Sequence, residues 1–265
     1  MSTYALGSTD AEHRRLIALA SHEEDRVVDA CRRANVAEGA TALDLGCGPL
    51  GALAALATVV GENGTVIGVD ASAAALEKAR TLLASPRVRF VHSDVNTLDH
   101  AEVDLAYSRL MLMHQADAAR TLHNIARLLK PGAVLIAHEA SDLLAHAPSS
   151  EPHVPAMTRV WELVIGAARA RGANSDFARN GRRYLEDAGF TVESHRAYFV
   201  HYPPEIGYEI PRVALQSLRP TLAEHSLASE EEIASLTREL EAAMERSDVQ
   251  WVTSPLMFEW IGRKR

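Results

Sequence analysis

The feature that most constrains the fold is a regular alternation of two kinds of apolar segment between about residues 41 and 200. Short segments rich in β-branched residues, typical of buried strands, alternate with longer Ala-, Leu- and Arg-rich segments of helical periodicity. The short segments are Thr41–Leu45, Thr65–Val69, Val88–His92, Val103–Tyr107, Ala133–Ala137 and Thr191–Val200. The longer segments are Ala52–Val60, Ala73–Ala84, Ala116–Leu129 and Val154–Arg171. This order predicts an α/β fold whose parallel sheet is covered by helices on both faces.

Two regions outside this alternation are predicted to add helices. Residues 10–34 precede the first expected strand, and residues 204–248 follow the last strand of the alternation. In the second region, Ser229 followed by Glu232 forms a capping box that marks the start of a helix. The expected helices are Ala11–Ala20, Glu23–Ala34 and Glu230–Arg246, and a final strand is expected over Leu256–Ile261.

Composition excludes several classes of function. The chain has 27 Lys and Arg against 35 Asp and Glu, so its net charge of −8 argues against the basic face that nucleic acid binding needs. Cys31 and Cys47 are too few for a disulfide framework or a multi-cysteine zinc site. No apolar run approaches the roughly 20 residues of a membrane-spanning helix, and Met1–Asp10 lacks a secretory signal pattern. We therefore expect a soluble, cytoplasmic protein that neither binds nucleic acid nor inserts into a membrane.

A glycine-rich turn follows the first expected strand. The strand ends near Asp44, and the turn Gly46-Cys47-Gly48-Pro49-Leu50-Gly51 opens onto a helix. Glycine lets the backbone approach a ligand and adopt turn conformations that side chains disfavour. The same glycines fit a dinucleotide fingerprint, and they also suit a tight strand-to-helix turn that binds nothing. The turn alone therefore leaves a binding role and a structural role open.

Acidic residues also mark the ends of the next two strands. The second strand ends at Asp70, which lies 24 residues after Gly46, and the third leads into Asp94. A carboxylate at Asp70 can accept hydrogen bonds from both ribose hydroxyls of a nucleoside. Asp94 can accept from the exocyclic amine of an adenine, and the Val95 amide can reach a ring nitrogen. Because parallel strands end at one edge of a sheet, Asp44, Asp70 and Asp94 are expected to lie together there.

This combination resembles the S-adenosylmethionine site of class I methyltransferases. The resemblance rests on Asp44-Leu45-Gly46-Cys47-Gly48 followed by Asp70 and Asp94. Asp104–His114 is similar to the fourth strand and following loop of the small-molecule branch, and Leu128–Ile136 to its helix, Pro-Gly turn and fifth strand. The likeness covers about residues 38–140. It implies a Rossmann-like, doubly wound, mostly parallel sheet of seven strands with the last antiparallel, and S-adenosylmethionine as the cofactor.

The sequence differs from the family pattern at two places. Pro49 and Leu50 intervene before Gly51, where the family often has Thr or Gly followed by Gly. Pro49 fixes one backbone angle and removes one donor, so we expect cofactor binding to survive it. Ser93-Asp94 replaces the more usual Gly-Asp, which is a mild change.

The resemblance implies a set of cofactor-binding residues, and the segment pattern suggests an organisation of the chain. The scattered histidines have no metal-ligand spacing, so no metal site is expected. The implied cofactor-binding residues are Tyr4, Asp44, Gly46, Cys47, Gly48, Asp70, Ala71, Asp94, Val95, Ser108 and Arg109. Helices in residues 1–37 are expected to cap the site, and residues 38–203 with 249–265 to form the cofactor-binding core. Residues 204–248 are then a helical insert that serves as a substrate lid.

The residues near the transferred methyl group are expected in the loop after the fourth strand. Ser108 and Arg109 are expected to contact the methionine half of the cofactor through their backbone. His114 is the candidate general base because an unperturbed imidazole has a pKa of about 6.5; packing against the neighbouring methionines is the alternative. His138 and Glu139 are either rivals for this role or simply polar residues at a strand end.

The acceptor is expected to be a small molecule, of natural-product or lipid-like kind, since the chain carries no basic stripe. The aromatic segment Tyr198–Pro204 either lines the acceptor pocket or belongs to the core. The sequence leaves open whether subunits pair as a homodimer or act singly. Two rival functions remain open, since fold does not fix function. One is a cofactor-dependent cyclase or non-methylating binding protein on the same fold, and the other is an NAD-dependent oxidoreductase.

Overall fold

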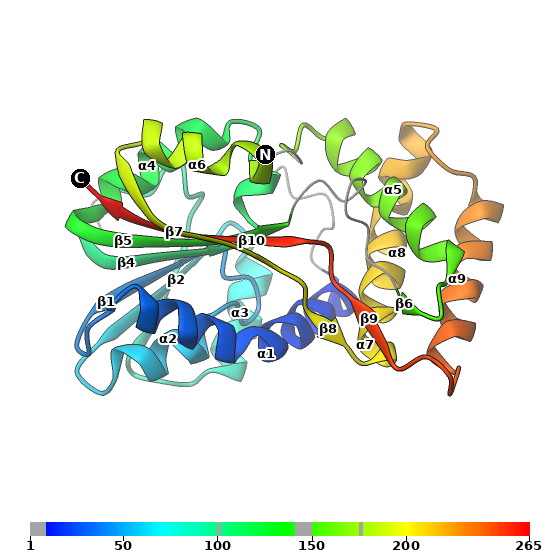
Figure 1. Ribbon diagram of the computed structural model, residues 1–265, viewed down its shortest axis with the longest axis horizontal. Coiled ribbons are helices and arrows are strands. Elements are labelled where there is room, and N and C mark those ends of the chain that lie inside the picture. The colour runs from blue at the N-terminus through cyan, green and yellow to red at the C-terminus, as the bar shows by residue number, and fades with distance from the viewer. Residues whose placement is uncertain (1–8, 100–101, 141–149, 175–176) are drawn as a thin grey trace.

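The computed structural model describes residues 9–99, 102–140, 150–174 and 177–265, and a seven-stranded sheet runs through its centre (Figure 1). The strands lie in the order β3-β2-β1-β4-β5-β10-β7. Their bounds are β1 Thr41–Leu45, β2 Thr65–Asp70, β3 Val88–His92, β4 Val103–Arg109, β5 Leu129–Ala140, β7 Phe190–Tyr198 and β10 Met257–Lys264. Strands β1 to β5 pair in parallel, and β10 runs antiparallel between β5 and β7. The predicted mostly parallel sheet of seven strands is confirmed.

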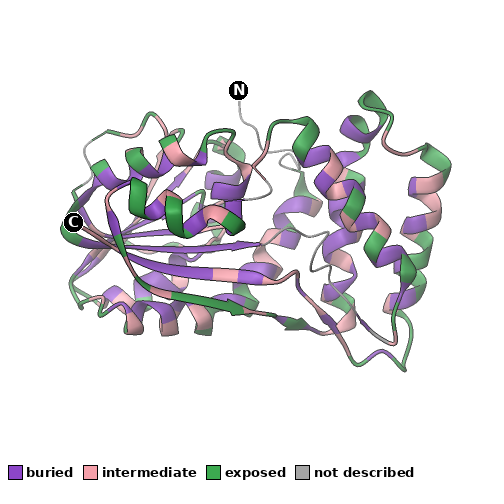
Figure 2. Cartoon of the chain, turned by 45° about the horizontal axis from the view of Figure 1, so that its top comes forward, coloured by how far each residue is buried: buried purple, intermediate pink, exposed green. Residues whose placement is uncertain are grey.

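Helices cover both faces of this sheet, as the alternation predicts. On one face lie α1 (Asp10–Arg33), α2 (Leu53–Val60) and α3 (Ala73–Leu82), whose buried side chains form one apolar cluster with the strands. On the other lie α4 (Ala118–Leu128) and α6 (Phe177–Asp187), which pack in a second cluster around Trp260 (Figure 1). Figure 2 shows that the central strands are buried along most of their length between these layers.

The prediction of two separate helices in residues 10–34 is wrong, because α1 is one continuous helix. It begins after Thr9, whose side chain accepts a hydrogen bond from the Glu12 amide. At the expected break, the Ser21 hydroxyl bonds to the carbonyl of Ile17, and the His22 ring lies 3.2 Å from the carbonyl of Ala18. These polar side chains are satisfied within the helix, so they do not interrupt it.

A helical lobe lies beside the sheet at one end (Figure 1). It contains α5 (Pro155–Ala170), α7 (Pro204–Gly207), α8 (Glu209–Glu224) and α9 (Glu230–Met244), with a small antiparallel sheet of β6 (Ser150–Glu151), β8 (His201–Tyr202) and β9 (Trp251–Thr253). The Ser229 hydroxyl accepts from the Glu232 amide, as the capping box predicts. Helix α5 shares one apolar cluster with α8 and α9, so the lobe is larger than residues 204–248. In the part of the chain that the structure describes, none of the helices has the length and apolarity of a membrane span.

A buried charge network anchors α1 to the sheet. Glu259 of β10 is 2% exposed and accepts a hydrogen bond of 2.7 Å from Arg33 of α1. The fully buried His138 of β5 lies 3.3 Å from the same carboxylate, and its other ring nitrogen lies 3.1 Å from the Tyr198 hydroxyl. Burial raises the pKa of Glu259, and the adjacent His138 and Arg33 more than reverse this, lowering it to about 2.

Replacing Glu259 by Gln should therefore destabilise the fold in a pH-dependent way. A carboxylate whose pKa falls from 4.5 to about 2 on folding contributes stability above about pH 4.5 and loses it as the pH falls towards 2. We expect the variant to lose about 2 kcal/mol of unfolding free energy near pH 7, with the deficit shrinking towards about pH 3. Urea unfolding measures this. The control is Glu193→Gln, which removes a more exposed ion pair with Arg263 and should cost less than about 1 kcal/mol. A deficit independent of pH would contradict the role of charge.

Candidate functional site

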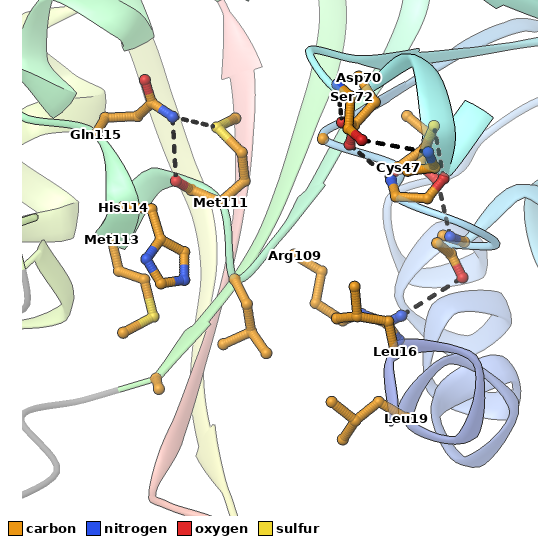
Figure 3. A pocket seen from close by; sticks show the side chains of 18 of the residues that line it. Leu16, Leu19, Cys47, Asp70, Ser72, Arg109, Met111, Met113, His114 and Gln115 are labelled. Atoms are coloured by element: carbon orange, nitrogen blue, oxygen red, sulfur yellow. Dashed lines mark hydrogen bonds between the residues drawn. The ribbon is translucent and has the colours of Figure 1, made fainter. Parts of the chain in front are cut away.

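A cavity of about 810 Å³ opens at the carboxyl ends of the parallel strands. This volume lies towards the upper end of the range for small-molecule sites, roughly 300–1,000 Å³. The cavity extends from the strand ends to α1 on one side and to the helical lobe on the other. Figure 3 shows the turns that carry Cys47, Asp70 and Ser72 on one side, facing the segment with Met113 and His114 on the other.

The glycine-rich turn takes the conformations that only glycine adopts readily. Gly46, Gly48 and Gly51 all have positive φ angles, of 69°, 55° and 54°. A Cβ at Gly46 would lie 2.7 Å from Met111 Cγ, and one at Gly51 would collide with the turn itself. At Gly48, which lines the cavity, the first atom that a Cβ would meet is Leu16 Cδ1 at 3.7 Å. The turn is thus closed by packing at two glycines and leaves backbone open to a ligand at the third.

Asp44 supports this turn from within. Its side chain is 2% exposed, and Oδ2 accepts a 2.7 Å hydrogen bond from the Ala52 amide at the start of α2. Burial raises the pKa of Asp44 to about 7, against the lowering effect of that hydrogen bond and of Arg109. The buried Cys47 lies in the same turn, where burial raises the pKa of its thiol well above the ordinary value. Cys47 is therefore a packing residue rather than a nucleophile.

Asp70 connects the first turn to the second. Its Oδ2 accepts from the Gly48 amide at 2.8 Å, and its Oδ1 accepts from the Ser72 amide at 2.7 Å. Each carboxylate oxygen has a further lone pair, so both can also accept a ribose hydroxyl at the cavity wall. Ala71 lines the cavity beside it.

Asp94 and Val95 reach the same cavity from the end of β3. The Asp94 side chain is exposed, and its Oδ1 accepts from the Asn96 amide at 2.8 Å, whereas Val95 is buried. Asp44, Asp70 and Asp94 all line the cavity, so three strand ends meet there. Their individual contacts with the cofactor stay predictions, and Tyr4 lies outside the described residues.

The loop after β4 is held by a residue whose role was left open in the sequence. Glu139, fully buried at the end of β5, accepts hydrogen bonds from the amides of Met111, Leu112 and Met113 at 3.2, 2.9 and 3.1 Å. Burial raises the pKa of Glu139 to about 7, and these amides oppose the shift. Ser108 is also fully buried and directs its hydroxyl at Glu139 rather than into the cavity. The carboxylate thus fixes the path of the 3₁₀ turn η1 (Leu112–His114).

Arg109 and His114 line the cavity on either side of this loop. Arg109 Nη2 donates to the Gly51 carbonyl at 3.4 Å, which ties β4 to the glycine-rich turn. Burial and the nearby Arg15 lower the pKa of His114 to about 4, so its imidazole is neutral at neutral pH. His138 instead lies in the buried network with Glu259, away from the cavity lining.

The part of the cavity nearest the helical lobe is mainly apolar. Its apolar lining residues are Leu19, Met113, Met157, Trp161, Val164, Tyr202, Ile210 and Met257. The expected aromatic segment divides in two, because Tyr202 lines the cavity while the ring of Tyr198 packs under the Arg26 guanidinium. This wall comes from segments far apart in the sequence, which explains why no local pattern revealed it.

Comparison with known proteins identifies the family. The family described as "Methyltransferase domain" matches residues 37–189, which is more than half of the chain. The chain belongs to this methyltransferase family. The match spans the glycine-rich turn and all three acidic strand ends, and it confirms the resemblance to class I methyltransferases. The cofactor of this family member is S-adenosylmethionine, which fits the open backbone at Gly48 and the accepting carboxylate of Asp70.

A named methyltransferase is among the individual relatives. The chain is 34% identical to the 2-phytyl-1,4-naphtoquinone methyltransferase of Nostoc punctiforme over 177 residues, covering 59% of this chain and 74% of that protein. It is 34% identical over 164 residues to an uncharacterised 37.1 kDa protein in transposon TN4556 of Streptomyces fradiae. That match covers 58% of this chain and 44% of the other protein. Among solved structures, the [4+2]-cyclase SpnF is 21% identical and has a TM-score of 0.53, which shows a shared fold. The superposition covers 91% of this chain and 81% of SpnF. The matches span between about two fifths and three quarters of the first curated relatives.

Asp70→Ala should weaken the binding of S-adenosylhomocysteine, the demethylated cofactor, by about 1 to 3 kcal/mol. That is the scale for hydrogen bonds to a charged group, and the change also removes the acceptor for two turn amides. Isothermal titration calorimetry measures it. The matched control is Glu77→Ala on the solvent-facing side of α3, which should leave the affinity unchanged. Equal affinity in wild type and Asp70→Ala would refute the role of this carboxylate.

Proposed function

We propose that this protein transfers the methyl group of S-adenosylmethionine to an O, N or C nucleophile of a small, largely apolar acceptor, such as a secondary metabolite. The observation that carries the proposal is a single cavity with two unlike parts. The strand ends around Asp70 supply hydrogen-bonding groups for a nucleoside, and the lobe side supplies an apolar wall. The naphthoquinone methyltransferase among the relatives supports an apolar, ring-containing acceptor.

The chain's own residues position the reactants and exclude water. When bound, S-adenosylmethionine supplies an electrophilic methyl group on a sulfonium, which a nucleophile attacks in line. Glu139 fixes the loop Met111–Met113, so that one wall of the cavity has a defined shape. Leu16 and Leu19 of α1 close the opposite side with apolar groups (Figure 3). Such enclosure strengthens electrostatic interactions at the reacting atoms.

His114 remains the proposed proton acceptor in this scheme. Its neutral imidazole carries an acceptor nitrogen, and the residue lies in the cavity wall. A pKa of about 4 makes it a weak base, so it suits an acceptor whose proton is already acidic. The proposal also includes a cytoplasmic location and pairing of two subunits into a homodimer.

Incubation with S-adenosylmethionine labelled in its methyl group tests the activity. With 1,4-naphthalenediol and other hydroxyl- or amine-bearing aromatic molecules as acceptors, we expect labelled product and S-adenosylhomocysteine in equal amounts. Tight cofactor binding without transfer to any acceptor would instead favour the alternative of a cyclase or a non-methylating binding protein; SpnF, a [4+2]-cyclase, shares the fold. The family match argues against the NAD-dependent oxidoreductase, and binding of NADH in place of S-adenosylhomocysteine would reverse that conclusion.

His114→Ala should lower turnover about 100-fold if the imidazole takes the proton, with little change in S-adenosylhomocysteine affinity. A base must be deprotonated, so its contribution is complete above about pH 5 and is lost as the pH falls through about 4. The rate of methyl transfer between about pH 4 and pH 8 in both proteins measures this. Turnover within a few-fold of wild type would return His114 to a packing role.

A further inference from the structure

The acidic side chain of Glu23 faces the cavity from α1. Leu16, Leu19 and Glu23 are spaced three and four residues apart, so they share one face of the helix. All three line the cavity, and Glu23 is only 4% exposed. The sequence gives no hint of this, because a glutamate in a helix with many charges is usually on the solvent side.

Glu23 differs from the other buried glutamates in its hydrogen bonding. Glu139 accepts from three amides, Glu12 from the guanidinium of Arg15, and Glu259 from Arg33. Among the residues that the structure describes, Oε2 of Glu23 has no hydrogen bond of good geometry, and its near neighbour is Arg26 Nε at 3.2 Å. Buried carboxylates are nearly always hydrogen-bonded, since desolvation without compensation is costly. A group at the cavity wall that lacks such donors is therefore prepared for a donor from a ligand.

The charge of Glu23, in contrast, is already balanced. Arg26 Nε lies 3.2 Å from its Oε2 without hydrogen-bonding geometry, and Arg109 and His22 are close enough to act on it electrostatically. Burial raises the pKa of Glu23, while Arg109 and Arg26 oppose the shift. The carboxylate is therefore suited to a neutral hydrogen-bond donor. A cationic ligand would be repelled by the two nearby guanidinium groups, those of Arg26 and Arg109.

The surroundings of Glu23 are apolar and aromatic. Leu19, one turn earlier on α1, packs in a cluster with Tyr202 and Ile210, against which Trp161 also packs. All four of these residues line the cavity. A ligand that reaches Glu23 must therefore place one polar group in a mainly apolar chamber.

We propose that Glu23 accepts a hydrogen bond from a neutral hydroxyl of the acceptor, and that the acceptors are apolar molecules bearing a phenol or an enol. This inference rests on the proposed function, because it takes the apolar part of the cavity as the acceptor site. Glu23 is then the residue that selects a hydroxyl-bearing acceptor over one of equal size without a donor. Such selection is strong, since a mismatched ligand leaves the buried carboxylate uncompensated.

Binding of three matched probes to protein saturated with S-adenosylhomocysteine tests the inference. 2-Naphthol carries a neutral donor, 2-methylnaphthalene carries none, and 2-naphthylmethylammonium carries a cationic one. We expect 2-naphthol to bind about tenfold or more tightly than 2-methylnaphthalene in calorimetry near pH 7. The ammonium probe should bind no more tightly than 2-methylnaphthalene, because Arg26 and Arg109 oppose its charge. Equal binding of the first two probes, or tightest binding of the ammonium probe, would overturn the proposal.

Two neighbouring variants assign the preference to one side chain. Glu23→Gln keeps the shape but not the charge, and should reduce the advantage of 2-naphthol to about threefold or less with unchanged S-adenosylhomocysteine affinity. Glu24→Gln, exposed on the same helix, should retain the full advantage. If Glu23→Gln still binds 2-naphthol about tenfold more tightly than 2-methylnaphthalene, the assignment to Glu23 is refuted. If that variant does not fold, the three probes on the wild-type protein still test whether the cavity prefers a neutral hydroxyl. Failure of wild type to bind S-adenosylhomocysteine would contradict the proposed function instead.

Discussion

The site depends first on the carboxylate of Asp70, which joins two turns that would otherwise be independent. By accepting from the amides of Gly48 and Ser72, it sets the spacing between the ends of β1 and β2. Asp44 does the corresponding work inside the first turn, where it receives the Ala52 amide. Charged acceptors placed on backbone donors make strong hydrogen bonds, so the ligand-facing backbone is ordered before any ligand arrives. This preorganisation gives the methyltransferase family assignment its physical basis.

The rest of the cavity is held by buried carboxylates of two different kinds. Glu139 and Glu259 are structural, because their oxygens receive hydrogen bonds from the β4 loop and from Arg33 of α1 respectively. Glu23 has its charge balanced by Arg26, and yet its Oε2 lacks a hydrogen bond of good geometry within the described part of the chain. The contrast separates the groups that build the walls from the one that is placed to meet an acceptor. In the function proposed above, α1 and the helical lobe select the substrate, and the strand ends bind the cofactor.

Most of the core was predictable because it depends on local patterns. The alternation of segments predicts the sheet and its two helical layers, and the turn from Gly46 with the acidic strand ends predicts the site's edge. The continuous α1 was missed, since Ser21 and His22 resemble a break until their bonds to the preceding turn are seen. The roles of Glu139 and Glu23 depend on burial and on partners distant in sequence. Nothing in the order of residues along the chain carries that information.

A crystal structure of the protein with S-adenosylhomocysteine tests the central claim most directly. We expect the adenosyl group at the carboxyl edge of the sheet, with its ribose hydroxyls on Asp70 and its adenine beside Asp94 and Val95. The amino-acid half is expected next to Arg109, with the sulfur atom facing the apolar part of the cavity. A nucleoside bound anywhere else on the molecule, or bound here without contact to Asp70, would contradict this claim.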